Sequence, residues 1–221
     1  MFQNDKKNYS IFDSMKNNER EGQFAWLYDL AFNPVLHRVH NSIVSLAKKY
    51  NCHSIIDLGS GTGAQARVLS HHGFSVTGVD ASPEMIVVSQ KKSPDSITFI
   101  KDDIRVISFK EKSFDAANIC LVLHPNSFQA IIQILDKAKS LIKPEGVIFI
   151  TDYGQGTGVS GQIANLIIRI IESCAQQNHR VNYYSFMSKN GVDMFSSWSD
   201  FTLLDKLHYF NGSLQTLVLK C

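Results

Sequence analysis

The sequence lacks a concentrated charge of either sign, paired cysteines and long apolar runs. Its 22 basic and 20 acidic residues are spread along 221 positions and leave a net charge of +2. No basic surface therefore points to a nucleic-acid backbone as partner. The four cysteines, Cys52, Cys120, Cys174 and Cys221, stand far apart, without the close pairs typical of zinc sites. We expect reduced thiols, no bound metal and no nucleic acid.

The chain also lacks an apolar run of about 18 residues, which predicts no integral membrane segment. Residues 1–22 are rich in Asn, Lys, Asp and Glu and contain no apolar signal-peptide core, so we expect a polar tail or cap and a cytoplasmic protein. With 44% hydrophobic residues in the whole sequence, residues 23–221 are enough for one well-buried domain.

The most informative stretch is Ser54–Gly63, in which an apolar run stops at an acid and three alternating glycines follow. This pattern predicts a buried strand, a tight turn and a helix. Gly59, Gly61 and Gly63 would let the backbone approach a bound molecule without a Cβ in the way. The helix N-terminus would offer unpaired N–H groups. The turn therefore predicts a site for a carboxylate or a phosphate.

Two cofactor classes remain open for this turn. Gly59, Gly61 and Ala64, with Asp80 about 20 residues further on, fit the looser dinucleotide pattern and would indicate an NAD(P)-dependent oxidoreductase. Asp57, placed before the first glycine, would repel a pyrophosphate but attract an ammonium or sulfonium group. Asp57 favours S-adenosylmethionine, which carries both cations and a carboxylate.

An acid followed by G-x-G-x-G resembles the first motif of the class I S-adenosylmethionine-dependent methyltransferases. The resemblance implies an α/β fold with a doubly wound, Rossmann-like sheet of seven strands, mostly parallel, with a C-terminal antiparallel hairpin. Apolar runs at 201–210 and 214–219, joined by Asn211 and Gly212, independently indicate this hairpin. The chain lacks the Asn/Asp-Pro-Pro-aromatic motif of enzymes that methylate base amino groups. It is similar instead to the small-molecule branch, related to quinone and phospholipid methylation.

The apolar patterns also place the remaining elements. Strands are predicted over 74–79, 97–100, 114–123 and 147–151, and helices over 64–72, 126–142 and 163–174. Leu166, Ile167 and Ile170 mark the last helix as amphipathic. We expect 155–199 to form a lid over the substrate side.

The cofactor site is predicted from strand ends and from the resemblance. Asp80 follows the second strand, where a carboxylate can accept from both ribose hydroxyls. The resemblance implies that Met85 covers adenine, that Asp103 and the Ile104 N–H bind its edge, and that Tyr28 closes the pocket. Core packing is the alternative for Tyr28 and Met85. The predicted cofactor residues are Tyr28, Asp57, Gly59, Ser60, Gly61, Gly63, Asp80, Ala81, Met85, Asp103, Ile104, Cys120 and Leu121.

Methyl transfer from a sulfonium requires mainly alignment of the nucleophile with the methyl group. A base helps if the acceptor is a hydroxyl, a phenol or an acidic carbon, and His124 and His179 are the histidines best placed for it. Hydrogen bonding or packing is the alternative for both. The predicted substrate-side residues are Asp152, Tyr153, Arg180, Tyr183 and Tyr184.

The sequence predicts a small aromatic or amphiphilic acceptor, a lipid-like one included. A nucleic-acid or protein methyltransferase and a noncatalytic S-adenosylmethionine-binding module remain as alternatives. The acceptor's identity, the methylated atom and the oligomeric state do not follow from the residues.

Overall fold

The computed structural model describes residues 36–221. The chain divides into two compact units, Met1–Val39 and His40–Cys221. Residues 36–39 of the first unit are helical. The predicted tail over 1–22 and the predicted cofactor residue Tyr28 lie outside the described residues. The sheet and the candidate site lie in the second unit.

One mixed sheet of seven strands, in the order β3-β2-β1-β4-β5-β7-β6, organises the second unit. Five strands are parallel, and β7 runs antiparallel to both β5 and β6. This topology confirms the predicted α/β fold with its C-terminal hairpin. The strands are β1 (Ser54–Leu58), β2 (Ser75–Asp80), β3 (Thr98–Lys101), β4 (Phe114–Cys120), β5 (Ile142–Tyr153), β6 (Thr202–Tyr209) and β7 (Leu214–Lys220).

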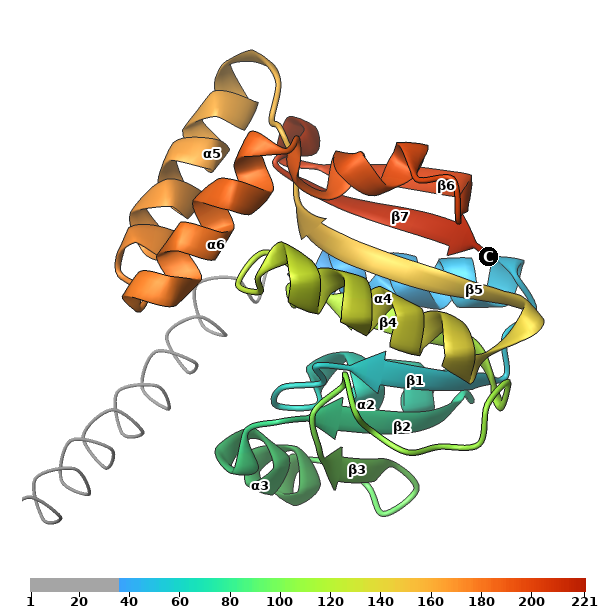
Figure 1. Cartoon of the computed structure of the whole chain (residues 1–221). Helices are drawn as coiled ribbons and strands as arrows, with labels where there is room; N and C mark the ends of the chain where they lie inside the picture. The colour runs from blue at the N-terminus through green and yellow to red at the C-terminus, as the bar shows by residue number, and fades with distance from the viewer. Residues whose placement is uncertain (1–35) are drawn as a thin grey trace, which may run out of the picture. The chain divides into compact units, whose positions relative to one another are not determined.

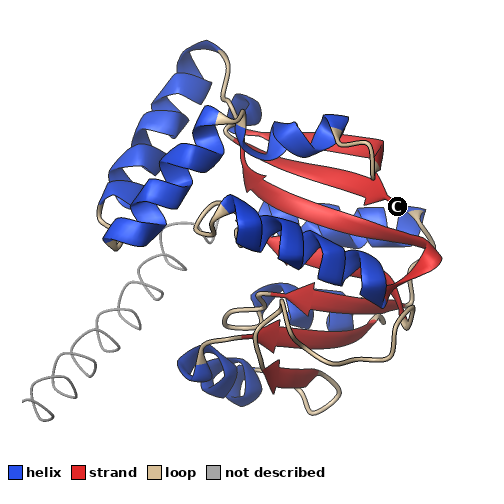
Figure 2. Cartoon of the chain, in the orientation of Figure 1, coloured by secondary structure: helices blue, strands red, loops and turns tan. Residues whose placement is uncertain are grey.

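Helices alternate with the parallel strands and lie on both faces of the sheet (Figure 2). Figure 1 shows α4 in front of the sheet and α2 behind it. A parallel sheet needs this double cover because both of its faces are apolar. The helices are residues 40–49, α2 (Ala64–His71), α3 (Pro83–Lys92), α4 (Phe128–Leu141), α5 (Gly158–Ser173) and α6 (Gln177–Ser188), with 3-10 turns η1 (Gly191–Ser197) and η2 (Phe210–Gly212).

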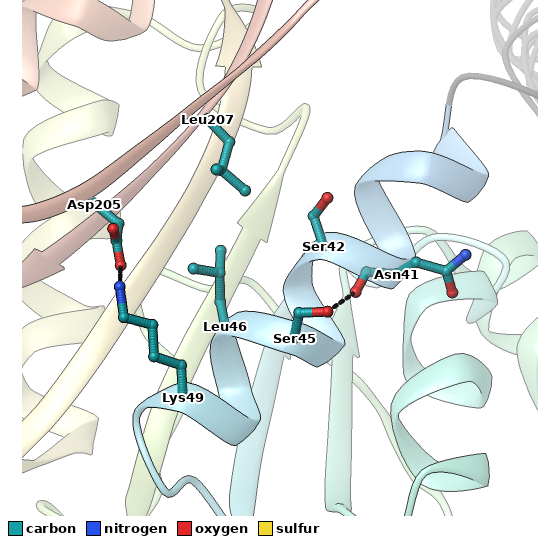
Figure 3. Close-up of a pocket in the computed structure, with 7 residues that line it drawn as sticks. All are labelled: Asn41, Ser42, Ser45, Leu46, Lys49, Asp205 and Leu207. Carbon is teal, nitrogen blue, oxygen red and sulfur yellow. Dashed lines mark hydrogen bonds and ion pairs between the residues drawn. The ribbon is translucent and has the colours of Figure 1, made fainter.

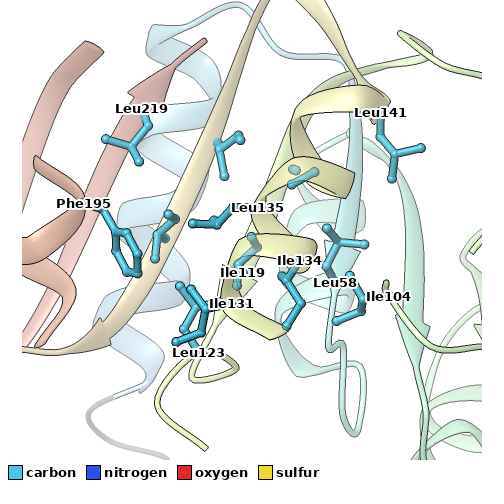
Figure 4. Close-up of a cluster of buried hydrophobic side chains, with 14 of the residues drawn as sticks. Leu58, Ile104, Ile119, Leu123, Ile131, Ile134, Leu135, Leu141, Phe195 and Leu219 are labelled. Atoms are coloured by element: carbon cyan, nitrogen blue, oxygen red, sulfur yellow. The ribbon is translucent and has the colours of Figure 1, made fainter. Parts of the chain in front are cut away.

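The core beneath α4 explains why the central strands are apolar. Ile131, Ile134 and Leu135 of α4 are at most 3% exposed and belong to one buried cluster with Leu58 of β1 and Ile119 of β4 (Figure 4). Burying such a side chain contributes roughly 1.5–3 kcal/mol relative to exposing it. This layer therefore holds the strand ends in fixed positions.

The end of β4 differs from the prediction. The strand stops at Cys120 rather than at Leu123, because Leu121 takes a left-handed φ of 58° and turns the chain out of the sheet. The next helix is capped by Ser127, whose hydroxyl accepts from the Ala130 N–H, and not by Asn126. The apolar pattern extended the predicted strand to Leu123, because Leu123 is fully buried although it lies outside the strand. The boundary of the following helix was misplaced with it.

Helix α5 is longer than predicted and turns a different face inward. It begins at Gly158, and the predicted apolar stripe is solvent-exposed, with Leu166, Ile167 and Ile170 all more than half exposed. The buried residues of the helix are Gly161, Ile168 and Glu172. The periodicity therefore identified the helix but not its buried face. The predicted lid over 155–199 contains α5, α6 and η1, and its closure stays a prediction.

Candidate functional site at the carboxyl edge of the sheet

The glycine turn after β1 has the left-handed backbone that its sequence predicts. Gly59, Gly61 and Gly63 have φ values of 79°, 51° and 77°. A Cβ on Gly59 would lie 2.3 Å from a Val122 methyl group, and one on Gly63 would lie 2.7 Å from the Phe99 ring. A Cβ on Gly61 would have no neighbour within 4 Å. Two of the glycines are thus required by packing, and only Gly61 offers open backbone to a ligand.

Asp57 is buried at the end of β1 with an incomplete set of hydrogen bonds. The Asn118 amide donates to one of its oxygens at 2.7 Å, while the other oxygen and the nearby Ser60 hydroxyl have no partner among the described residues. Burial raises the pKa of Asp57 to about 6, against the bond from Asn118 and aided by the charge of Asp80. A buried acceptor without a donor costs free energy. This carboxylate therefore suits a ligand that brings a cation or a donor.

Asp80, the last residue of β2, lies next to the turn, as predicted from its place at the strand's carboxyl end. Its two oxygens accept from the Gly61 N–H at 2.8 Å and the Ser82 N–H at 2.9 Å. These bonds fix the carboxylate against the loop. The neighbouring Ala81 is exposed and Met85 is half-buried.

Asp103 and Ile104 follow β3 at the same edge. The Asp103 carboxylate pairs with the Arg105 guanidinium through its Nε and Nη2 atoms, and this bond holds the pKa of Asp103 below its usual value. Ile104 packs into the core at 9% exposure. The predicted contacts of these residues with adenine remain predictions.

A buried polar network joins the ends of β4 and β5 to α5 and α6. His124 Nδ1 lies 2.8 Å from Asp152 Oδ1, and its Nε2 faces Glu172 Oε1 at 3.6 Å. The Tyr153 hydroxyl donates to Glu172 Oε1 at 2.9 Å, and His179 Nε2 lies 2.6 Å from Glu172 Oε2. Five residues from four segments thus share one chain of contacts.

Opposing effects set the pKa values within this network. Burial acts to lower the pKa of His124, but the carboxylates of Asp152 and Glu172 outweigh it and raise that pKa. Burial acts to raise the pKa of Glu172, but the bond from His179 and the charge of His124 lower it. The arrangement therefore favours a protonated His124 beside an ionised Glu172, or a bound cation in place of the histidine proton.

The structure brings most of the predicted substrate-side residues to this network. Asp152, Tyr153 and Tyr183 are buried, whereas Arg180 and Tyr184 are exposed on α6. The Tyr183 ring lies edge-on to His124, with centroids 6.3 Å apart.

Glu172, at the centre of the network, was missed by sequence reasoning. Its spacing from Gly161 and Ile168 could have identified it, because helical periodicity puts these three residues on one side of α5, away from the aliphatic stripe of Leu166, Ile167 and Ile170.

Cys120, the last residue of β4, feels the charges of both Asp57 and Asp152. Burial, with the charges of Asp57 and Asp152, raises the pKa of its thiol well above the usual range. The sulfur is therefore protonated at neutral pH and unsuited to act as a nucleophile. Leu121, also predicted to contact the cofactor, is half-buried beside it.

An open groove of about 390 Å³ lies elsewhere, between residues 41–49 and β6 (Figure 3). Lys49 and Asp205 form an ion pair of 2.6 Å across it. None of the predicted site residues lines it.

Comparison with known proteins finds similarity to methyltransferases. Residues 56–150 match the sequence family described as "Methyltransferase domain". The chain is 35% identical over 98 residues to YqeM of Bacillus subtilis (strain 168), which is named as a methyltransferase, covering 42% of this chain and 40% of that protein.

Two further relatives carry names that refer to quinone compounds. The chain is 32% identical over 111 residues to the 2-methyl-6-phytyl-1,4-hydroquinone methyltransferase of Synechocystis sp., covering 46% of this chain and 32% of that protein. It is 28% identical over 112 residues to the demethylmenaquinone methyltransferase of Thermotoga maritima, covering 50% and 48%. The chain thus spans less than half the length of these three relatives.

Solved structures share the fold. The plantazolicin methyltransferase BpumL in complex with SAH superposes with a TM-score of 0.65 at 18% identity, covering 91% of this chain and 90% of that one. A 1,6-didemethyltoxoflavin-N1-methyltransferase of Burkholderia thailandensis gives 0.56 at 16% identity, covering 99% and 89%. No helix among residues 36–221 has the length and apolar content needed to span a bilayer.

Proposed function

We propose that this protein transfers a methyl group from S-adenosylmethionine to a small molecule, because residues 56–150 match the methyltransferase domain family. The antiparallel β6–β7 hairpin argues against the dinucleotide alternative, because such domains normally end in a parallel sixth strand. The cofactor would supply a methyl group already activated by its sulfonium charge. The chain's part is to bind, align and exclude water.

The observation that carries the proposal is the Asp57 oxygen that has no partner among residues 36–221, at the end of the strand that leads into the open backbone of Gly61. A cationic ligand group at this carboxylate would offset the cost of its burial. Asp80, already fixed by two backbone donors, retains lone pairs for ribose hydroxyls. Both acids lie at the carboxyl ends of adjacent strands, so one ligand can reach both.

For the acceptor we propose an aromatic, amphiphilic small molecule. The names of two relatives refer to a hydroquinone and a menaquinone precursor. The residues at the end of β5 and on α6 are rich in tyrosine, and rings of this kind stack against aromatic acceptors. A lipid-like tail on that acceptor belongs to the same proposal.

The two predicted bases differ in access. His124 is 2% exposed, so its ring does not reach an acceptor in this conformation. The His179 side chain is 35% exposed and lies nearer the surface. Alignment alone supports transfer to a reactive carbon or nitrogen, so neither histidine is required by the proposal.

Calorimetry with S-adenosylhomocysteine tests the cofactor site. We expect micromolar binding to the full chain and a loss of at least tenfold in Asp57→Asn. Asp205→Asn, in the distant groove, is the matched control and should bind normally. No binding to the unaltered protein, or equal binding to both variants, would contradict the proposal.

Methyl-labelled S-adenosylmethionine then tests the acceptor. The label is offered with a lipid extract and, separately, with water-soluble metabolites. A labelled aromatic product from the lipid extract supports the proposed acceptor, and one from the soluble pool restricts it to a polar aromatic. Binding without product in either pool would indicate the noncatalytic module.

A further inference from the structure

We propose that His124, Glu172 and His179 form a binding site for a divalent transition-metal ion of the zinc class. The three side chains come from the loop after β4, from α5 and from α6, and their ligand atoms all lie within 4.8 Å of one another. Two imidazoles and one carboxylate are a ligand set that zinc uses in catalytic sites. The inference does not depend on the cofactor or the acceptor.

The separation of His124 from Glu172 is the first argument. His124 Nε2 and Glu172 Oε1 are 3.6 Å apart, which is too long for a hydrogen bond. It is close to the spacing of about 3.3 Å between two ligands of a tetrahedral ion with bonds near 2.0–2.1 Å. A metal ion fits between these atoms better than a proton does.

The second argument is the support behind His124. Its other nitrogen, Nδ1, lies 2.8 Å from Asp152 Oδ1, which fixes the ring and leaves Nε2 to face the site. Asp152 is itself held by the N–H groups of Leu123, His124 and Tyr153. A carboxylate that orients a histidine in this way is typical of metal sites, where it tunes affinity.

The third argument is charge. The Asp152 and Glu172 side chains are 0% and 3% exposed, and two buried carboxylates require positive charge. Among residues 36–221, no Arg or Lys side chain forms an ion pair with either acid. Within this part of the chain, the cationic side chains that can pair with them are the two histidines. One divalent ion, or one proton added to each histidine, would balance the charge of the two carboxylates. The metal titration below distinguishes these two cases.

His179 lies where a metal ion could enter the site, and it can be replaced with little risk to folding. Its side chain is 35% exposed, so an ion can reach the site from the surface, and its replacement does not open a large cavity. Glu172 Oε2 lies 2.6 Å from His179 Nε2, so the metal would replace the direct contact of this pair.

The test is a titration of the metal-depleted full chain, purified without a histidine tag, with Co²⁺ and then Zn²⁺. We expect one equivalent of Co²⁺ to bind with a visible d–d absorption, and Zn²⁺ to displace it. His179→Ala and Glu172→Gln should each weaken binding at least 100-fold. His208→Ala, which removes an exposed histidine from β6, is the matched control and should bind as the unaltered protein does.

Asp152→Asn adds a variant that leaves all three ligands in place. Loss of the supporting carboxylate should weaken Co²⁺ binding about 10–100-fold. Circular dichroism is recorded for every variant, and His179→Ala alone decides the matter if the buried variants do not fold. No d–d absorption at millimolar Co²⁺, or unchanged affinity in His179→Ala, would overturn the site and leave two protonated histidines as its occupants.

Discussion

At the residue scale, Asp57 couples stability to pH. Its pKa is about 6 in the folded protein and about 3.9 in an unfolded chain, so the folded state holds this proton more tightly. The stability contributed by this group is therefore complete below pH 4, and it is lost as the pH rises through 6. Above that pH the native state carries a buried charge.

Asp57→Asn should remove the part of the pH dependence of stability that comes from Asp57. Relative to the variant, the unaltered protein should lose about 3 kcal/mol of unfolding free energy between pH 4 and pH 7, because each pKa unit corresponds to about 1.4 kcal/mol. Urea unfolding of both proteins across this range measures the difference. A difference that stays constant with pH would show that Asp57 titrates normally.

The glycine turn allows packing to be separated from ligand access. Gly59→Ala would place a methyl group 2.3 Å from Val122 and should cost roughly 2–4 kcal/mol of unfolding free energy through overpacking and backbone strain. Gly61→Ala has open space and should cost only about 1–2 kcal/mol, from its left-handed backbone.

In S-adenosylhomocysteine binding the order should be the opposite of that in stability, so that Gly61→Ala loses more affinity than Gly59→Ala. Folded Gly61→Ala should bind more weakly than the unaltered protein, because its methyl group occupies the approach to the loop. Guanidinium unfolding and calorimetry on the same samples measure both effects. Equal losses of affinity would mean that Gly61 has no special access to the ligand.

Residues at strand ends were predictable, whereas the pairing of a loop residue with a residue on a distant helix was not. Asp57 and the glycines occupy one turn, so the sequence placed them together. Glu172 meets His124 across 47 intervening positions, and nothing in either segment indicates the pairing. The exposed aliphatic side of α5 also pointed away from Glu172, because periodicity alone does not say which stripe is buried.

At the element scale, Asp115 fixes the start of β1 against β4 and β5. It accepts from the N–H groups of His53 and Ser54 at 2.9 and 2.8 Å and pairs with Lys143 at 2.6 Å. Partial burial acts to raise its pKa, but the bonds from Lys143, Ser54 and His53 outweigh it and hold that pKa well below the usual value. The carboxylate thus ties three strands together at their starting ends.

Asp115→Asn should cost roughly 2–3 kcal/mol at pH 7, because bonds to a charged acceptor are lost. A depressed pKa contributes stability that is present above about pH 4 and lost as the pH falls below it. The gap between variant and unaltered protein should therefore narrow in acid. Glu145→Gln, which removes the exposed pair with Lys220, is the control and should change stability by less than about 1 kcal/mol. Equal effects of the two variants would contradict the anchoring role.

The orientation of α5 gives a second test at this scale. Leu166 is 58% exposed and Ile168 is 7% exposed. Leu166→Gln should change the unfolding free energy by less than about 0.5 kcal/mol, whereas Ile168→Ala should cost about 2–4 kcal/mol. Denaturant unfolding measures both. The opposite order would mean that the aliphatic stripe is the buried face.

At the scale of the whole molecule, topology was more predictable than boundaries. Strand, glycine turn and helix follow local rules, and the Asn211–Gly212 turn fixed the antiparallel end of the sheet. The exit of the chain at Leu121 depends on tertiary contacts, since its N–H donates to the Thr151 carbonyl at 2.8 Å. An apolar run in the sequence does not indicate such a hydrogen bond, so the end of the strand could not be predicted from it.

Cofactor binding should stabilise the fold as a whole, because the site joins the ends of adjacent strands. Ligand at 100 times its dissociation constant adds about 2.7 kcal/mol to the free energy of unfolding. For a chain of 221 residues, this should raise the melting temperature by about 5–10 °C. S-adenosylhomocysteine should give this shift and NAD should give none, measured by differential scanning fluorimetry. Replacement of both Asp57 and Asp80 by Ala should abolish it, whereas a shift with NAD alone would assign the glycine turn to a dinucleotide.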